Sequence, residues 1–411
     1  MHLISQYKGL PKQVYMICAA RIIAGMGAFI FSFSTLLMTG VLGMSDIAAG
    51  YMTIVNSVAS LIGAVICGRL ADMFSRKKVL LGIFALQIAV LILGGFVVYT
   101  KASLFCIVMV GFCFSGFIPI LAAMITDVTD DSNRKESFSL LFLCINIGYS
   151  LGQIIAGQLF YNHTRWIFWG QGLAFIIAFT LVFFFVKDIN PEKVKPAEKE
   201  VTPRGEISDF FKSVLKDKVL IIFLCAAILA QYCYSQLHYL MPLQLTDLFG
   251  LEISSKNVSY VWTINGFCCV ALTPLLLSFT KRFSQITNVA IASAFFLIGM
   301  GSYAFLRGES TMWIVLAGTP IWTAGEVLLS TGTGVFIADR AKPEHRATYQ
   351  SLYALATDIG RCAGPVTMGY LLQAIAYADG WFAVCFCAAV AIIILMFGLR
   401  CYHKEQAAKL Q

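Results

Sequence analysis

The sequence predicts an all-α membrane protein in which twelve transmembrane helices form two pseudo-symmetric six-helix bundles. An apolar composition and an internal repeat carry this prediction. The 411 residues are 59% hydrophobic and 13% charged, against about 25% charged in an ordinary soluble domain. A soluble core cannot absorb this much apolar helix, so most of the chain must face lipid or other spans.

The internal repeat consists of five residue pairs, each separated by 212 positions. Asp127, Arg134, Gly148, Gly152 and Gly157 recur as Asp339, Arg346, Gly360, Gly364 and Gly369. A repeat of this length means two structurally equivalent halves. Embedded in apolar sequence, it indicates a transporter built from two bundles around a shared axis.

Apolar stretches long enough to cross a bilayer, roughly 20 residues each, follow one another with short interruptions. They cover residues 14–40, 47–70, 79–99, 103–126, 136–160, 166–186, 219–244, 257–279, 287–306, 311–338, 347–375 and 380–400. One segment, 187–218, is instead rich in charges and contains three prolines. We therefore predict an N-terminal bundle over 1–186, a cytoplasmic linker over 187–218, whose residues 207–215 form an amphipathic helix on the inner surface, and a C-terminal bundle over 219–411.

The basic residues predict the orientation. If both termini are cytoplasmic, the outer loops contain only four of the 30 Lys and Arg residues, Lys101, Arg165, Lys256 and Arg307. This is the positive-inside bias of a multi-pass protein of the cell membrane. The net charge of +8 therefore reflects topology and gives no support for nucleic-acid binding. We expect a monomer.

A charge inside a span costs about 2.5–3.5 kcal/mol even on the mildest scales, so it needs a partner or a purpose. Glu326 lies 13 positions before Asp339, which is roughly 20 Å of helix rise. A carboxyl group in apolar surroundings can take up and release protons, so Glu326 is the best candidate proton carrier. The alternative is a protonated, purely structural acid.

Four further polar residues lie within spans. Asp358 reaches a depth similar to that of Glu326, and Arg361 follows it at i+3, so the two either form a structural pair or take part in proton coupling. His238 either relays protons or is a neutral hydrogen-bonding residue. Arg21 lies in the inner third of the first span.

Aromatic and small residues complete the candidate set. Six aromatic residues either line a substrate cavity or face lipid, and for Trp322 ordinary helix packing is a further alternative: Phe112, Phe114, Phe117, Trp262, Trp322 and Tyr353. The three repeated glycines of each half allow close helix packing in the small-xxx-small manner, and Pro365 interrupts its helix. The thirteen cysteines include no CxxC motif, so we expect no metal site.

The loop between the second and third spans carries a family resemblance. Gly68-Arg-Leu-Ala-Asp72-Met-Phe-Ser-Arg76-Lys77-Lys78 resembles the signature loop of the major facilitator superfamily, with Met73 and Ser75 as departures. The resemblance implies a cytoplasmic gate formed by Gly68, Asp72, Arg76 and Lys77, to which we add the repeated Asp127, Arg134, Asp339 and Arg346. We expect Asp72 to cap the inner end of a helix, while Arg76 and Lys77 stay at the anionic inner leaflet.

Within this superfamily, the chain is similar to the twelve-span drug:proton antiporters of bacteria. Gly325-Glu326 and Gly360-x-x-x-Gly364-Pro365 match that branch, in which the membrane-embedded acid takes part in proton coupling. Two features depart from it: no basic residue occurs between Lys101 and Arg134, and Gln153 replaces the proline expected after Gly152.

These features predict proton-coupled export of amphiphilic or cationic small molecules by alternating access. The partners are the substrate, protons and the lipid bilayer, and the energy source is the proton gradient, without a cofactor. The main alternative is a proton-coupled carrier of one defined metabolite, such as a sugar, a peptide or an amino-acid product, and a remote one is a non-transporting receptor or a lipid-moving scaffold. The sequence contains no nucleophile–base motif, metal-ligand spacing or phosphate loop, so we do not expect an enzyme.

Overall fold

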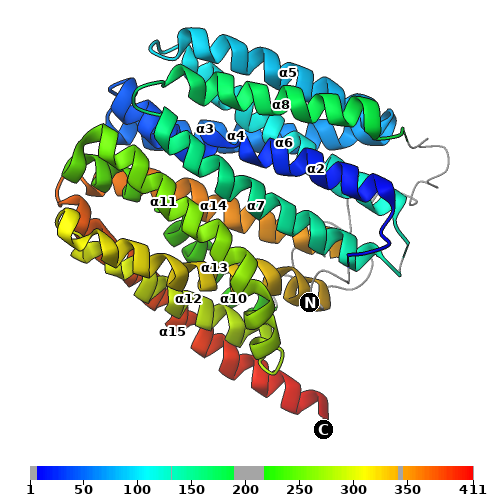
Figure 1. Cartoon of the computed structure of the whole chain (residues 1–411). Helices are drawn as coiled ribbons and strands as arrows, with labels where there is room; N and C mark the ends of the chain where they lie inside the picture. Colours follow the sequence, from blue (N-terminus) through cyan, green and yellow to red (C-terminus); the bar gives the residue numbers. More distant parts are fainter. Residues whose placement is uncertain (1–6, 131, 189–216, 341–345, 411) are drawn as a thin grey trace, which may run out of the picture. The chain divides into compact units, whose positions relative to one another are not determined.

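The computed structural model describes residues 7–130, 132–188, 217–340 and 346–410. Within these ranges every regular element is a helix and there is no strand (Figure 1). Ten helical segments in the described ranges are long and apolar enough to cross a membrane. The all-helical membrane class is confirmed, whereas the number of twelve spans stays a prediction. The predicted amphipathic helix at 207–215 lies outside the described residues.

Two features explain why ten candidate spans are found where the sequence predicts twelve. Residues Lys218–Thr280 form one apolar helical stretch of 63 residues, in which the sequence analysis placed two spans. The helix Arg346–Leu371 is absent from the ten candidates, and it is interrupted by polar residues such as Gln350, Asp358 and Arg361, which lower its mean hydropathy.

By internal contacts the chain divides into two compact units. The first contains Met1–Lys195 and Leu245–Val270, and the second contains Pro196–Gln244 and Ala271–Gln411. The sequence analysis assigned 245–270 to the C-terminal bundle. This segment groups with the first unit because the Ser255 hydroxyl donates to Gly157 O at 3.5 Å and the Thr263 hydroxyl donates to Ser150 O at 3.4 Å.

Among the described residues, the N-terminal part of the first unit contains eight helical elements. They are α2 (Lys12–Met26), α3 (Phe29–Leu36), the π-helix η1 (Leu37–Val41), α4 (Asp46–Met73), α5 (Arg76–Val97), α6 (Ser103–Val128), α7 (Arg134–Leu159) and α8 (Arg165–Phe185). Helix α2 packs against α7 and α8, and α5 packs against α6 and α8.

The second unit repeats this arrangement. Its elements are α10 (Lys218–Ser235), α12 (Gln285–Gly301), the short 3-10 helices η3 (Ser302–Phe305) and η4 (Glu309–Thr311), α13 (Met312–Arg340), α14 (Arg346–Leu371) and α15 (Tyr377–Leu410). Helix α10 packs against α14 and α15, and α12 packs against α13 and α15. These pairs are the counterparts, 212 residues later, of the pairs in the first unit.

Helix α11 (Leu240–Thr280) contributes residues to both units. The predicted spans leave a loop over 245–256, but the segment is helical apart from Gly250, which has a φ of 72°. Glycine has no Cβ and adopts this left-handed conformation without a steric penalty. The Glu252–Lys256 ion pair, at 3.0 Å, bridges one turn of the helix that follows.

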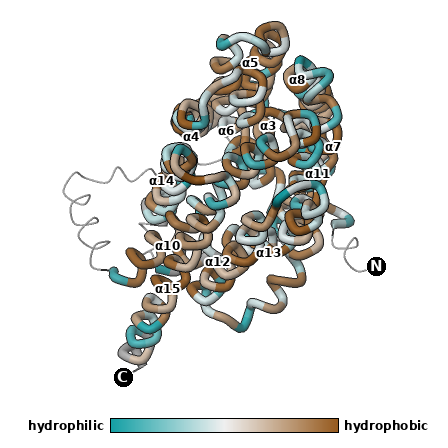
Figure 2. Tube along the Cα trace, turned by 90° about the vertical axis from the view of Figure 1, so that its left-hand side faces the viewer, coloured by the Kyte–Doolittle hydropathy of each residue, from teal (hydrophilic) through white to brown (hydrophobic). Residues whose placement is uncertain are grey.

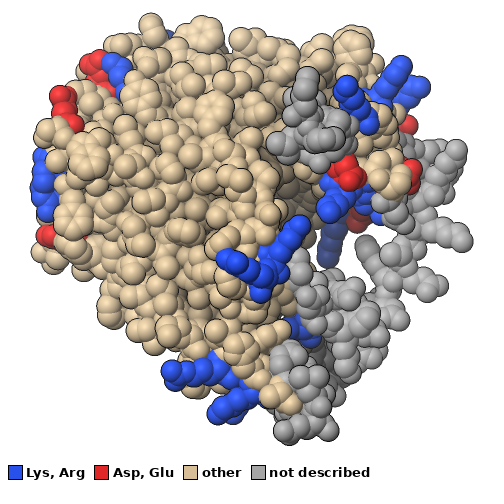
Figure 3. Space-filling view, turned by 60° about the horizontal axis from the view of Figure 1, so that its bottom comes forward, with Lys and Arg blue, Asp and Glu red and all other residues tan. Residues whose placement is uncertain are grey.

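The surfaces of the helices are apolar over most of their length. Figure 2 shows hydrophobic residues along the helices and hydrophilic ones mainly towards their ends, and Figure 3 shows broad uncharged stretches between groups of charged residues. Large apolar side chains such as Phe96, Phe184 and Phe386 are 66–70% exposed. Such exposure suits a surface that faces lipid.

Glycines bring the first and fifth helices of each unit into backbone contact. A Cβ at Gly148 or Gly152 of α7 would lie 2.3 Å from a backbone oxygen of α2, that of Ile22 or Met26. In the second unit, a Cβ at Gly360 of α14 would lie 2.1 Å from Ile228 O of α10. Any larger residue at these positions must force the helices apart.

We therefore expect Gly148→Ala to destabilise the protein by about 1–3 kcal/mol through overpacking. Gly82→Ala is the matched control, because Gly82 lies in α5 and a Cβ there would have no neighbouring atom within 4 Å. There the same change removes only the helix penalty of glycine. The apparent midpoint of thermal unfolding in detergent should fall for Gly148→Ala alone, and equal midpoints would contradict the packing argument.

Candidate functional site

A carboxyl group lies at the midpoint of α13. Glu326 is half-buried and accepts a 2.9 Å hydrogen bond from the Tyr234 hydroxyl of α10. Gly325 lets this part of α13 approach α12, since a Cβ there would lie 2.7 Å from Ala292 O. The Gly-Glu pair of the sequence therefore combines close packing with a membrane-embedded acid.

Two aromatic rings lie beside the ring of the tyrosine that binds Glu326. The Tyr234 ring makes an edge contact with His238 at a centroid distance of 5.8 Å and lies 6.5 Å from the Phe296 ring. The structure thus brings two predicted residues, Glu326 and His238, to the same tyrosine. Tyr234 is not among the predicted residues, although its place one turn before His238 in an apolar span was a usable signal.

The second acid, Asp358, lies on α14 in a more open setting. Its carboxylate is 3.9 Å from Arg361 Nη1, and the two side chains are 37% and 50% exposed. Arg361 Nη2 also donates to Gln231 Oε1 of α10 at 3.5 Å. The expected i,i+3 pair is present, at a distance and exposure that make it weak.

Trp322 belongs to a buried polar network of the second unit. Its Nε1 donates to the Tyr303 hydroxyl at 2.9 Å, and the Tyr303 ring packs against Trp381 at 4.8 Å. Trp381 Nε1 in turn donates to Gln244 Oε1 at 2.7 Å. Trp322 is fully buried, so its bonds hold α13, α15, α11 and η3 together. Whether it also lines a substrate cavity stays a prediction.

In the first unit Arg21 lies against two aromatic rings of α6. Its guanidinium carbon is 5.4 Å from the centroid of Phe114 and 5.0 Å from that of Phe117. Arg21 is 6% exposed, and its Nη1 has no hydrogen-bond partner among the described residues. Stacking on an aromatic face offsets part of the cost of burying the cation.

The other aromatic residues predicted for a cavity lie in different surroundings. Phe117 and Trp262 are buried, whereas Phe112 and Tyr353 are partly exposed. The Trp262 ring makes an edge contact with Tyr149 at 6.1 Å.

The first span is broken, which the sequence analysis did not foresee. Helix α2 ends at Met26 and α3 begins at Phe29. Two buried glutamines bond the freed backbone groups: Ile30 N donates to Gln171 Oε1 at 3.1 Å, and Gln153 Nε2 donates to Ala28 O at 3.4 Å. Broken transmembrane helices require such partners. The replacement of a proline by Gln153 was the sequence signal for this bond.

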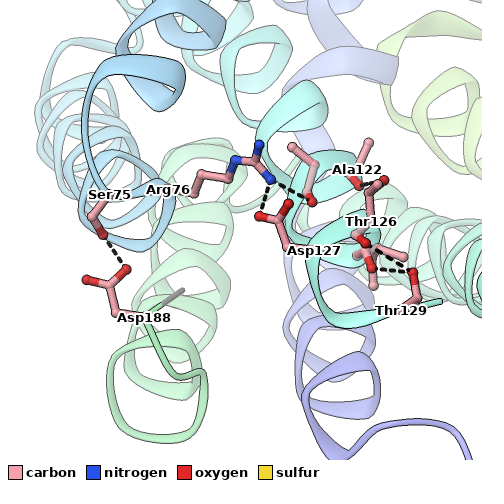
Figure 4. A network of polar contacts seen from close by, with 9 residues as sticks. Ser75, Arg76, Ala122, Thr126, Asp127, Thr129 and Asp188 are labelled. Atoms are coloured by element: carbon pink, nitrogen blue, oxygen red, sulfur yellow. Dashed lines mark hydrogen bonds and ion pairs between the residues drawn. The ribbon is translucent and has the colours of Figure 1, made fainter. Parts of the chain in front are cut away.

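An ion pair joins the ends of α5 and α6 at the predicted cytoplasmic gate (Figure 4). Arg76 Nη1 pairs with the Asp127 carboxylate and also donates to Ala123 O at 2.9 Å. Lys77 Nζ donates to Phe183 O of α8 at 2.8 Å. Arg76 and Lys77 of the signature loop therefore both donate hydrogen bonds within the first unit.

Asp72 differs from the expectation. It lies in the last turn of α4 and is exposed, and Ser75 caps α5 by accepting a 3.2 Å bond from Lys78 N. The predicted cap is wrong, because serine at the position before α5 supplies the acceptor. Gly68 lies one turn earlier with open space at its Cβ position. The gate role of both residues stays a prediction.

Of the remaining predicted gate residues, the structure describes the side chain of Arg134 but not those of Asp339 and Arg346. Arg134 Nη2 donates to Thr129 O at 3.2 Å. Arg340, which follows Asp339, makes a two-pronged pair with Asp217 at 2.7 and 2.8 Å and a further pair with Glu405 at 3.0 Å. Burial alone would lower the pKa of Arg340, but these two carboxylates raise it overall.

Metal and disulfide chemistry have no visible basis in the described residues. No group of three His, Cys, Asp or Glu side chains there has the spacing of a metal site. All thirteen cysteines, which lie in the described ranges, are free.

A family model decides the class of this fold. Residues 17–365 match the model of the Major Facilitator Superfamily, which spans most of the chain. The chain belongs to the major facilitator superfamily. Members of this superfamily are transporters, and the ten apolar helices are in accord with a multi-pass membrane transporter.

Several major facilitator relatives have similar sequences. The chain is 26% identical to the uncharacterized MFS-type transporter YhjO of Bacillus subtilis over 81% of this chain and 79% of that protein. It is 25% identical to multidrug resistance protein 1 of the same organism, covering 81% and 82%. It is 21% identical to a Na(+), Li(+), K(+)/H(+) antiporter of Planococcus maritimus, covering 78% and 80%.

Solved structures share the major facilitator fold at low identity. The nucleoside transporter NupG matches with a TM-score of 0.76 at 13% identity, over 95% of this chain and 99% of that one. A peptide transporter POT in complex with sulfate matches with a TM-score of 0.73 at 13% identity, over 97% and 95%. These likenesses show the fold.

The Arg76–Asp127 pair is suited to a double-mutant cycle. Its side chains are 18% and 7% exposed, and bonds between charged groups in such surroundings are worth about 1.5–3 kcal/mol. We expect Arg76→Gln and Asp127→Asn to show a coupling energy in this range when the free energy of unfolding is measured in mixed micelles.

The Glu252–Lys256 pair provides the control, because its side chains are 48% and 36% exposed. Exposed i,i+4 pairs contribute about 0.3–0.5 kcal/mol. Equal coupling energies for the two pairs would contradict a structural role of the Arg76–Asp127 bond.

Proposed function

We propose that the protein exports amphiphilic or cationic small molecules in exchange for protons, by alternating access between its two halves. The observation that carries this proposal is Glu326, an acid at the midpoint of an apolar helix that is held by a tyrosine hydroxyl. A mid-membrane acid is costly and is by default a functional group.

The bond from Tyr234 suits an acid that changes its protonation state. A phenolic hydroxyl donates to an ionised carboxylate and, after rotation, accepts from a protonated one. Glu326 therefore keeps its position in both states while its charge changes. Protonation from outside removes the negative charge that attracts a cation, which releases the substrate outward, and loss of the proton to the cytoplasm restores it.

Two relatives support this choice of function. One is named a multidrug resistance protein and another a cation/H(+) antiporter. Neither identity exceeds 25%, so the physical argument from Glu326 carries more of the proposal than the names do.

The proposed arrangement in the membrane follows from the charge distribution. Twelve spans in two bundles place both termini and the linker 187–218 on the cytoplasmic side of the cell membrane. The transporter works as a monomer and needs the proton gradient in place of a cofactor.

Arg21 supports a second candidate, the carriage of one defined anionic metabolite. A buried guanidinium with an Nη1 that lacks a partner among the described residues is suited to a carboxylate or phosphate group. In this case anionic solutes should compete with transport, whereas cations should not.

For the first candidate we expect Glu326→Gln to lose gradient-driven export of a cationic dye by tenfold or more, an effect of about 1.4 kcal/mol or greater. The amide keeps the size and the bond to Tyr234, so downhill equilibration of neutral substrates should persist. Dye uptake into inverted vesicles with and without a proton gradient measures both.

Asp358→Asn is the comparison variant, since Asp358 is the second acid within a predicted span and has an arginine beside it; it should retain gradient-driven export if Glu326 alone carries the proton. Tyr234→Phe removes the hydroxyl that bonds Glu326 and should weaken gradient-driven export of the cation. Full retention of proton-driven cation export by Glu326→Gln would overturn the assignment.

The orientation has its own test. Single cysteines introduced next to Lys101, Arg165 and Arg307 in a cysteine-free background should react with an impermeant maleimide in intact cells. Cysteines in the 187–218 segment should react only after the membrane is opened. Labelling of that segment in intact cells would reverse the proposed topology.

A further inference from the structure

A groove lies between α12 and α15 in the second unit. It encloses about 300 Å³, and its lining includes Ile286, Ala290 and Ala294 of α12 and Leu395, Met396 and Leu399 of α15. These three α12 residues recur every four positions, so they share one face of the helix over about 12 Å. Small alanine side chains there leave the hollow, and its lining is apolar apart from Thr287.

Basic residues gather at one end of this groove. Lys281 and Arg282 lie four and three residues before the start of α12, while Arg400 follows the lining residue Leu399, and Lys404 lies one turn further along α15. All four are exposed. The sequence contains no acid between 271 and 308 or between 380 and 404, and Glu405, the next acid, pairs with Arg340.

The arginine before α12 is held in place at this end. Its guanidinium carbon is 4.3 Å from the centroid of Phe279 and 5.0 Å from that of Phe283. Stacking of this kind leaves the N–H edges of a guanidinium available for an oxyanion. The start of α12, capped by Ser284, adds the positive end of a helix dipole on the same side.

We propose that this groove binds one acyl chain of an anionic phospholipid, whose phosphate headgroup is held by Lys281, Arg282 and Arg400. Lipid tails are as apolar as the groove, so the chain fixes the position and adds little selectivity. Selection comes from the headgroup, because basic pockets between transmembrane helices bind anionic lipid headgroups. This site is independent of the transported substrate.

The test uses the full-length protein in nanodiscs that contain phosphatidylglycerol and phosphatidylcholine at equal amounts. Native mass spectrometry of the protein released from them counts the retained lipids of each kind. We expect the parent to retain phosphatidylglycerol preferentially, and Arg282→Gln and Arg400→Gln each to reduce that preference about fivefold.

The groove itself is tested by Ala290→Leu, which fills the hollow and should also abolish retention. Ala89→Leu on α5 is the matched control, because Ala89 is exposed on a helix of the other unit. If Ala290→Leu does not yield a folded protein, Ala294→Leu at the next turn serves instead. Equal retention of both lipids by the parent, or undiminished retention by the groove-filling variant, would overturn the proposal.

Discussion

Polar groups inside a bilayer must find their partners within the protein, because the hydrocarbon supplies none. The structure meets this constraint at several interruptions of its described helices. Gln153 and Gln171 bond the backbone freed between α2 and α3, and Tyr234 bonds the carboxyl group of Glu326. In the second unit, the Tyr303 hydroxyl and Gln244 likewise accept bonds from two buried indole donors, those of Trp322 and Trp381. The polar residues of the spans thus stabilise the fold and supply its chemistry.

The same constraint explains why the first and fifth helices of each unit touch so closely. Between apolar helices in lipid there is little hydrophobic force, so their association depends on dispersion contacts between closely spaced backbones. Glycines at 148, 152, 360 and 364 provide this approach in both units. Since Gly152 is followed directly by Gln153, close packing also brings the amide to the break in the first span.

The class of fold and several local pairs could be predicted from the sequence alone. Composition and the 212-residue repeat indicated a helical transporter, and the i,i+3 spacing indicated the pairing of Asp358 with Arg361. Contacts between distant segments could not be predicted in this way. The bond between Tyr234 and Glu326 joins residues 92 positions apart, and the bond between Gln171 and Ile30 joins residues 141 positions apart. Helical periodicity fixes neighbours within one helix, whereas these partners depend on how the helices are arranged. The continuation of α11 through 245–256 was missed because charged and polar residues there resemble a loop.

Bonds between charges join helix ends in both units, but not at matching positions. In the first unit Arg76 of α5 bonds Asp127 of α6, whereas in the second unit Arg340 of α13 bonds Asp217, just before α10, and Glu405 of α15. Dissolved ions screen charges near water more strongly than buried groups. Salt in the surrounding water should therefore loosen these helix ends, while the amide bonds at the break between α2 and α3 keep their strength.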